Sequence, residues 1–518
     1  MKTGLSRTVD GWVRTVNLSL PSLQDNTADA DRLKHILRKT LRTDHVHIDT
    51  NILRELPFHI RDWHYAARCI VIKDPATEQW YLIGILNPLE DRPVTGVAVD
   101  LGTSRVAVRM VALVSGNVLY ETSFDNPQLQ VGPDVLTRVH ACDQPGGLSS
   151  LNQMLIQELN RQIHKACQAC DLETQDVYFM ALAGNTCMTH FFMGLSPRWM
   201  IREPYIPVIN SPDLERAATY GIQINPAGRA LVFPNIGSYF GGDLIAGILH
   251  SGIGKQTEPA ILVDVGTNAE VVLGNDSWLV ACAGAAGPAL EGGVARIGMM
   301  AGPGVVDRVR IDADSHAIEV HTIEKMPAIG ICGSGVIDLA ANLFLAGMID
   351  LRGRFVPEAC GDKLTIQAGM PFFEVVSADT SGTGSALKIS QADLDSLIRS
   401  KAAMYTILET ITDSVGMTLN DLKTFYVAGT FGTFIDPVSA VTIGMLPDLP
   451  TGTYRPLGNS SLEGATQVLT SCESLLQIGK IKEKITYLEL NVNQTFMNRF
   501  SAAKFIPHTD TSRFPSLK

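Results

Sequence analysis

The feature of this sequence that most constrains its fold is a motif that occurs twice, 164 residues apart. Each copy is an apolar run that ends in Asp-x-Gly-Thr and is followed directly by a second apolar run, with Asp100 in the first copy and Asp264 in the second. The pattern predicts two buried strands joined by a tight turn. Two such hairpins so far apart predict an α/β chain built from two similar halves.

The turn of the first hairpin has the residue types that bind phosphate. Gly102 lets the backbone turn sharply and approach a ligand, and Thr103 and Ser104 offer hydroxyls beside backbone N–H groups. Asp100, at the end of its strand, is placed to hold a nucleotide-bound Mg²⁺, usually through water. A single turn of this kind is more often an ordinary glycine turn, so the second copy is what favours phosphate binding.

The second hairpin has the same motif, with Asp264, Gly266, Thr267 and Asn268. Each half then offers one carboxylate and one Gly-Thr turn. We therefore expect the two hairpins to hold one polyphosphate and its metal from both sides.

A third glycine turn follows the apolar strand 425–428 and contains Gly429, Thr430 and Gly432. Because glycines at both ends of the turn leave the backbone open, a flat base or a ribose could lie on it. Three glycine turns in this order predict a nucleotide site more specifically than one.

Asp243 is a candidate catalytic residue, because it follows Gly241-Gly242 at the start of an apolar helix. It either caps the helix or orients and deprotonates an attacking water.

Asn185 is likewise a helix N-cap or a site residue, and His190 is interpreted as structural. The glycine-dense loop 282–293 is a flexible closure, an anion nest or simply a tight connection.

The domain organisation follows from these patterns and from the length of 518 residues, which suits two or three domains. Residues 1–95 are predicted to form a small α+β domain with a linker at 87–95, including a helix opened by 25–31 and a hairpin of 68–73 with 80–86. The remaining expectations are a first half at 96–258, a second half at 259–504 and a polar tail at 505–518. Within the second half, Lys401 is expected to be a solvated charge on a helix beginning at Gln391.

Charge and leader sequence exclude several classes of protein. The formal net charge is −11, which argues against a general nucleic-acid binder. No signal-peptide pattern and no apolar run long enough for a membrane span are found, so a soluble, cytoplasmic protein is expected.

The nine cysteines are scattered, and Cys167 and Cys170 form the only C-x-x-C. A single pair on a predicted helix cannot supply four ligands to zinc or an iron–sulfur cluster, so both are interpreted as ordinary helix residues.

The motif order resembles the actin, sugar-kinase and Hsp70 (ASKHA) ATPase superfamily and, within it, the reductive activators of corrinoid proteins. The shared stretches, besides the two hairpins, are Asn126-Pro-Gln, Ala183-Gly-Asn-Thr, Ala285-Ala-Gly-Pro-Ala-Leu-Glu-Gly, Gly330-Ile-Cys-Gly-Ser-Gly and Ala428-Gly-Thr-Phe-Gly. Residues 1–95 resemble that family's small middle domain.

The resemblance implies an ATPase that uses Mg²⁺ and ATP, binds a corrinoid protein in its inactive Co(II) state and promotes its reduction to Co(I). It also implies a methyltransferase system in anaerobic metabolism and leaves a homodimer open. There are two departures. The clustered cysteines of an iron–sulfur domain are absent, so the electron is expected from a separate protein or a missing domain. Arg105 stands where a small hydroxyl residue is usual.

Two other functions remain open from the sequence. A small-molecule kinase of the same fold would use Asp243 to deprotonate a substrate hydroxyl, although no sugar-binding polar cluster is recognisable. A non-catalytic scaffold would merely bind the nucleotide, and the presence of both aspartates argues against it.

Overall fold

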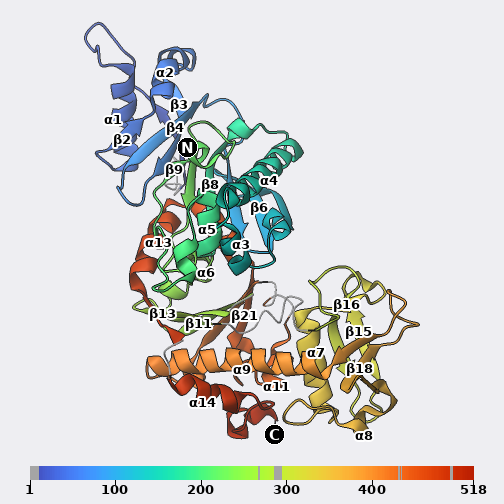
Figure 1. Ribbon diagram of the computed structural model, residues 1–518. Coiled ribbons are helices and arrows are strands. Elements are labelled where there is room, and N and C mark those ends of the chain that lie inside the picture. Colours follow the sequence, from blue (N-terminus) through green and yellow to red (C-terminus); the bar gives the residue numbers. More distant parts are fainter. Residues whose placement is uncertain are drawn as a thin grey trace, which may run out of the picture. The chain divides into compact units, whose positions relative to one another are not determined.

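The structure is a computed structural model that describes residues 11–266, 269–284, 295–429, 432, 435–490 and 494–517. The chain forms two compact units (Figure 1). The first comprises Met1–His250 and Ser460–Glu483, and the second Ser251–Asn459 and Lys484–Lys518. None of the described helices is long and apolar enough to cross a membrane.

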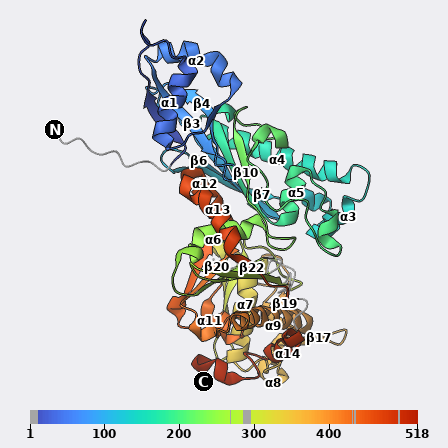
Figure 2. The ribbon, with the colours of Figure 1, turned by 90° about the vertical axis from the view of Figure 1, so that its left-hand side faces the viewer.

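The N-terminal domain is a four-stranded sheet with two helices against it (Figure 2). Its strand order is β1-β3-β4-β2, and the predicted hairpin is confirmed as β3 and β4. The elements are β1 (Val13–Asn17), α1 (Asp29–Leu41), β2 (Val46–Ile48), α2 (Thr50–Asp62), β3 (Ala66–Lys73) and β4 (Trp80–Leu86).

The start of α1 differs from the prediction. Its N-cap is Ala28, which has no side-chain acceptor, and the Asp25 carboxylate accepts from Arg32. Helix α2 was not predicted, and Pro57 inside it obscures the helical pattern.

The first six-stranded sheet has the order β7-β6-β5-β8-β10-β9. Strand β5 is antiparallel to β6 and parallel to β8, and β8 is parallel to β10. The strands are β5 (Thr95–Leu101), β6 (Arg105–Ala112), β7 (Val118–Asp125), β8 (Val177–Gly184), β9 (Glu215–Arg216) and β10 (Arg229–Val232).

Helices cover both faces of this sheet. Val97 and Val99 share a buried cluster with α4 (Gly147–Ala169) and α5 (Thr186–Met193). On the other face, a Cβ at Gly96 would lie 3.0 Å from Leu469 Cδ2 in α12 (Ser460–Thr470). Helix α12 and most of α13 (Cys472–Lys484) thus belong to the first unit, although the sequence pattern placed them in the second half.

The second six-stranded sheet repeats the topology of the first in five strands and differs in the sixth, because β22 pairs with β13 whereas β9 of the first sheet pairs with β10. Its order is β21-β20-β11-β12-β13-β22, with β11 antiparallel to β12 and parallel to β20, and β20 parallel to β21. Strand β11 is therefore the counterpart of β5, β12 of β6 and β20 of β8. The strands are β11 (Ala260–Val265), β12 (Ala269–Gly274), β13 (Leu279–Gly284), β20 (Thr424–Ala428), β21 (Tyr454–Gly458) and β22 (Ile485–Tyr487).

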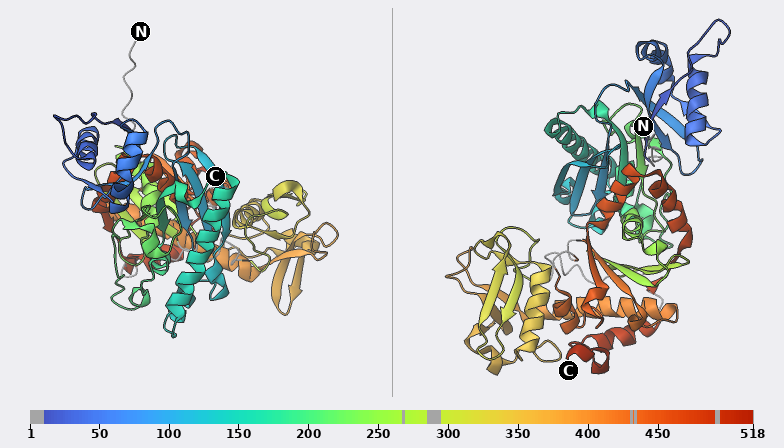
Figure 3. Two further views of the ribbon diagram at one scale, coloured as in Figure 1. Left: turned by 90° about the horizontal axis from the view of Figure 1, so that it is seen from above. Right: turned by 180° about the vertical axis from the view of Figure 1, so that it is seen from behind.

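The rest of the second unit consists of two small sheets and further helices (Figures 1 and 3). Residues 352–390 contain the whole sheet β17-β18-β19. The elements are β14 (Val305–Ile311), β15 (Ile318–Thr322), β16 (Gly330–Ile331), α7 (Gly333–Leu345), α8 (Pro357–Cys360), β17 (Leu364–Gln367), β18 (Met370–Val376), β19 (Leu387–Ser390), α9 (Gln391–Ser414), α11 (Pro437–Thr442) and α14 (Gln494–Ala503).

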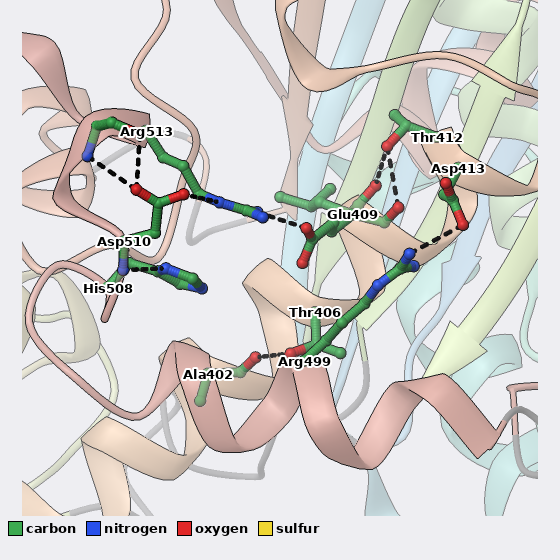
Figure 4. Close-up of polar contacts among 11 residues, drawn as sticks. Ala402, Thr406, Glu409, Thr412, Asp413, Arg499, His508, Asp510 and Arg513 are labelled. Carbon is green, nitrogen blue, oxygen red and sulfur yellow. Dashed lines mark hydrogen bonds and ion pairs between the residues drawn. The ribbon is translucent and has the colours of Figure 1, made fainter.

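The C-terminal residues pack against one face of α9 (Figure 4). Arg513 pairs with Glu409, and the rings of Phe514 and His508 lie 5.6 and 5.5 Å from that of Tyr405. The prediction that Lys401 is solvated was wrong. Its side chain is fully buried, and its ammonium group donates to the carbonyl oxygens of residues 505 and 507.

Candidate active site

The first hairpin places Asp100 and a half-buried glycine turn at one end of the first sheet. Asp100 lies opposite Ala107 in β6 and beside Ala183 in β8. A Cβ at Gly102 would lie only 2.3 Å from the carbonyl oxygen of Arg105, so no larger residue fits this turn. Thr103 and Ser104 follow it directly and are partly exposed.

Two asparagines hold this turn from opposite sides, and sequence reasoning gave neither of them this role. Asn126 is buried, its Nδ2 donates to the Gly102 carbonyl at 3.0 Å, and its backbone N–H donates to the Ser104 carbonyl at 2.8 Å. Asn185 Nδ2 donates to Thr103 Oγ1 at 3.0 Å. Because Thr103 Oγ1 accepts this bond, its own hydrogen can donate to an anion.

The N-cap interpretation of Asn185 is confirmed, since its Oδ1 accepts the Met188 N–H at 3.0 Å at the start of α5. One side chain therefore fixes both the helix and the turn. The sequence signals for Asn126 were Asn-Pro after a strand and the stretch Asn126-Pro-Gln shared with the family.

Asp243 lies in the first turn of α6 (Gly242–Ser251), with Oδ1 accepting the Leu244 N–H at 2.9 Å. Burial, and then the nearby Asp100 carboxylate, raise the pKa of Asp243 to about 7, although one edge of the side chain still reaches solvent. A Cβ at Gly241 would lie 2.5 Å from the Asn185 Cα. The structure thus brings Asp100, Asn185 and Asp243 together within the first unit.

The second hairpin places Asp264 and Gly266 at the corresponding end of the second sheet. Asp264 lies beside Ala428 in β20, as Asp100 lies beside Ala183 in β8. Gly266 is half-buried, and Thr267 and Asn268 lie outside the described residues.

Glu270 is a site candidate that the sequence analysis did not assign. It stands directly opposite Asp264 in the antiparallel register, where the first hairpin has Ala107. Residues opposite each other on neighbouring strands project from the same face of a sheet. The signal was the final Glu of Asp-Val-Gly-Thr-Asn-Ala-Glu.

The third glycine turn adjoins the second hairpin. Gly429 has a φ of +80°, and a Cβ there would lie 2.9 Å from Asp264 Oδ1. A Cβ at Gly432 would lie 2.4 Å from the Val427 carbonyl oxygen. Thr430 lies outside the described residues.

The remaining predicted features do not join these residues. Residues 285–293 of the glycine-dense loop lie outside the described part of the chain. Arg105 donates to Ser123 Oγ at 3.1 Å. Cys167 and Cys170 are free thiols at the end of α4, and no group of three or more metal-binding side chains occurs within the described residues.

His190 is structural, as predicted. It is fully buried, its Nδ1 donates to the Thr186 carbonyl at 2.7 Å, and its Nε2 accepts the Val208 N–H at 3.1 Å. The two partners fix this tautomer, and burial lowers the pKa of the ring.

Three family models match the chain. Residues 258–518 match the C-terminal domain of RACo, described as the ASKHA domain; residues 95–256 match the RACo middle region; and residues 12–90 match the RACo linker region. The predicted duplicated ASKHA fold is confirmed. The RACo middle region matches the first half of the chain, and the N-terminal domain matches the linker region. The prediction that residues 1–95 resemble the family's middle domain was therefore wrong.

Two characterised relatives are similar over most of this chain. The corrinoid activation enzyme RamQ of Eubacterium limosum is 30% identical, over 79% of this chain and 70% of the relative. The [Co(II) methylated amine-specific corrinoid protein] reductase of Methanosarcina barkeri is 25% identical, over 78% of this chain and 75% of the relative.

One solved structure is similar over the whole chain. It is a reductive activator for corrinoid, iron–sulfur protein, with a TM-score of 0.87 and 34% identity, covering 100% of this chain and 82% of the other.

Proposed function

Because the chain belongs to the RACo family of reductive activators of corrinoid proteins, we propose that it reactivates a corrinoid protein at the expense of ATP. It binds the corrinoid protein in the inactive form, in which the cobalt is Co(II). One electron from a low-potential donor, such as an iron–sulfur protein or an iron–sulfur domain outside these 518 residues, reduces Co(II) to Co(I), while ATP and water yield ADP and phosphate.

The observation that carries this proposal is the family match along nearly the whole chain, together with the glycine turns at the strand ends of both sheets. The turns themselves require glycine, because a Cβ at Gly102 or Gly429 would lie 2.9 Å or less from an oxygen atom of the protein.

The described residues fit Mg²⁺ and ATP. Asp100 and Asp264 are proposed to hold Mg²⁺, through water, because each ends a strand beside a glycine turn. Gly102, Thr103, Ser104, Gly266, Thr267 and Asn268 are proposed to bind the phosphates, and Gly429, Thr430 and Gly432 to border the adenosine.

Asp243 is proposed as the base that takes a proton from the attacking water. A carboxylate with a pKa of about 7 is half-ionised near neutral pH, where it can accept a proton and release it again. Asn126 and Asn185 hold the first turn in place, so that Thr103 needs no rearrangement to donate to a phosphate oxygen.

The role of ATP is to change the relative affinity of the activator for the Co(II) and Co(I) forms of the corrinoid protein. An activator that bound the Co(II) and Co(I) forms equally would shift neither population, however tightly it bound. Coupling between ATP and partner is reciprocal for binding, so the corrinoid protein must in turn change the affinity for nucleotide.

The test combines the chain, Mg–ATP and a Co(II) corrinoid protein, with and without a low-potential reductant, while the cobalt is followed by its absorption. We expect Co(I) only when ATP and the reductant are both present. ATP turnover that responds to no corrinoid protein, together with ADP release stimulated by a metabolite, would instead favour the kinase. No turnover under any condition would favour a nucleotide-binding scaffold.

A further inference from the structure

The first unit carries an apolar surface patch formed by the loop between α5 and β9 and by the segment between β10 and α6. The patch consists of Tyr205, Ile206, Val208 and Tyr239, which we call the Tyr205–Tyr239 patch. The tyrosines are 43% exposed, and Ile206 and Val208 are 59% exposed. Contiguous exposed apolar residues of this kind commonly mark a binding surface.

The patch is held in a fixed shape. The two tyrosine rings lie 6.0 Å apart, and Ser238 Oγ donates to the Tyr205 carbonyl at 2.6 Å. Pro207, between the two exposed aliphatic residues, is buried. An ordered loop loses little conformational entropy when a partner binds it.

Hydrogen bonds connect the patch to the first phosphate turn. The Val208 N–H donates to His190 Nε2, and His190 Nδ1 donates to the Thr186 carbonyl at the start of α5. Asn185, the N-cap of the same helix, donates to Thr103 Oγ1.

A second connection runs along the chain. Thr186 Oγ1 donates to the Gly237 carbonyl at 3.2 Å, and Tyr239 precedes Asp243 by four residues. The first connection thus ends at Thr103, and the second joins the segment that precedes Asp243 to the start of α5.

The size of the patch argues for a partner that binds and leaves. Four side chains of these sizes and exposures present roughly 350 Å² of apolar area. A standard-size interface buries roughly 800 Å² on each partner, of which somewhat over half is apolar, so the patch falls short of a stable homodimer and suits a smaller, transient contact. An activator has to release its partner after each reduction.

We propose that the Tyr205–Tyr239 patch is a docking surface for the corrinoid protein and that its connections to Thr103 and Asp243 link docking to ATP turnover. This inference rests on the proposed function and adds to it the surface that the partner occupies.

The test replaces Ile206 and Val208 together by serine, because their side chains are exposed and the Val208 N–H bond to His190 is retained. The matched control is the double variant Leu20→Ser and Leu23→Ser, since both leucines are exposed apolar residues of the N-terminal domain. The dissociation constant of the complex with a Co(II) corrinoid protein that binds the wild-type chain is measured by calorimetry, and basal ATP turnover is measured alongside.

We expect the patch variant to bind the corrinoid protein about tenfold or more weakly, as truncation of central interface side chains commonly does. Basal ATP turnover and the control variant should match wild type. Equal affinity of patch variant and wild type would overturn the docking surface while leaving the proposed function intact.

Two further outcomes would also overturn this inference. If the patch variant sediments as a monomer where wild type is a dimer, a second copy of the chain occupies the patch. If the wild-type chain binds no corrinoid protein at all, the proposed function fails and the docking surface fails with it.

Discussion

The two six-stranded sheets share the topology of five strands but differ in the residues around their aspartates. In the first sheet, Asp100 faces Ala107 across the hairpin and has Asp243 as a nearby carboxylate. In the second, Asp264 faces Glu270 and lies against Gly429. The strand framework is thus duplicated, whereas the chemistry beside each aspartate is not.

The comparison extends to the turns after β8 and β20. Gly184 pairs with Leu101 at the end of β5, and Gly429 follows Ala428, the partner of Asp264, in the matching place. Only Gly429 has a positive φ. After Gly184 the chain enters α5 through the Asn185 cap, so the first half uses this position to fix the phosphate turn. We infer that the second half uses it to leave open backbone for adenosine.

The largest effect is expected from replacing the aspartate that ends the first strand of the hairpin in each half. Asp100→Ala and Asp264→Ala should each lower ATP turnover about 100-fold or more, because each removes a proposed carboxylate of the metal site. Turnover is measured as phosphate release at saturating Mg–ATP, with the exposed Asp314→Ala as control. Full turnover in either variant would show that its hairpin serves the fold alone.

A smaller effect is expected at Gly429, where the turn after β20 differs from the turn after β8. Gly429→Val should raise the dissociation constant for ATP about tenfold, because its Cβ would lie 2.9 Å from Asp264 Oδ1 and the backbone has a φ of +80°. Calorimetric titration measures it. Gly452→Val is the control, since a Cβ there would meet no atom within 4 Å and its φ is not positive. Unchanged affinity would remove Gly429 from the adenosine site.

The smallest effect concerns Asp243, which has a raised pKa of about 7 against an ordinary value of 3.8. Between these values the folded state binds more protons than the unfolded state, so this group makes stability fall as pH rises from about 4 to 7. Asp243→Asn should therefore raise the melting temperature, relative to wild type, by a few degrees more at pH 8 than at pH 5.

The melting temperature is measured by thermal unfolding without nucleotide. Two further variants test whether the pH dependence arises from Asp243. Asp100→Asn should weaken the pH dependence, because the Asp100 charge contributes to the raised pKa. Asp264→Asn is the control from the second half. An equal change at both pH values in Asp243→Asn would show that Asp243 titrates normally.

Much of the site could be predicted from the sequence because its elements are local. An apolar run followed by Asp-x-Gly-Thr predicts both a strand and its turn, and the repeat of this pattern predicts the duplication. The same locality made the Asn185 cap predictable. Glu270 had a local signal in the same motif that was not used. Asn126 could not be given its position in this way, because the pairing of β7 with β6, and not sequence spacing, brings it to Gly102.

The sequence by itself determined the two hairpins, the duplicated α/β halves and the likeness to corrinoid-protein activators, since each depends on short contiguous motifs. Only the tertiary structure decided where α12 packs, what raises the pKa of Asp243 and why Lys401 is buried. The charge pattern of α9 alone predicts a solvated lysine. The carbonyl oxygens of residues 505 and 507, more than 100 residues away, accept its hydrogen bonds and make burial tolerable.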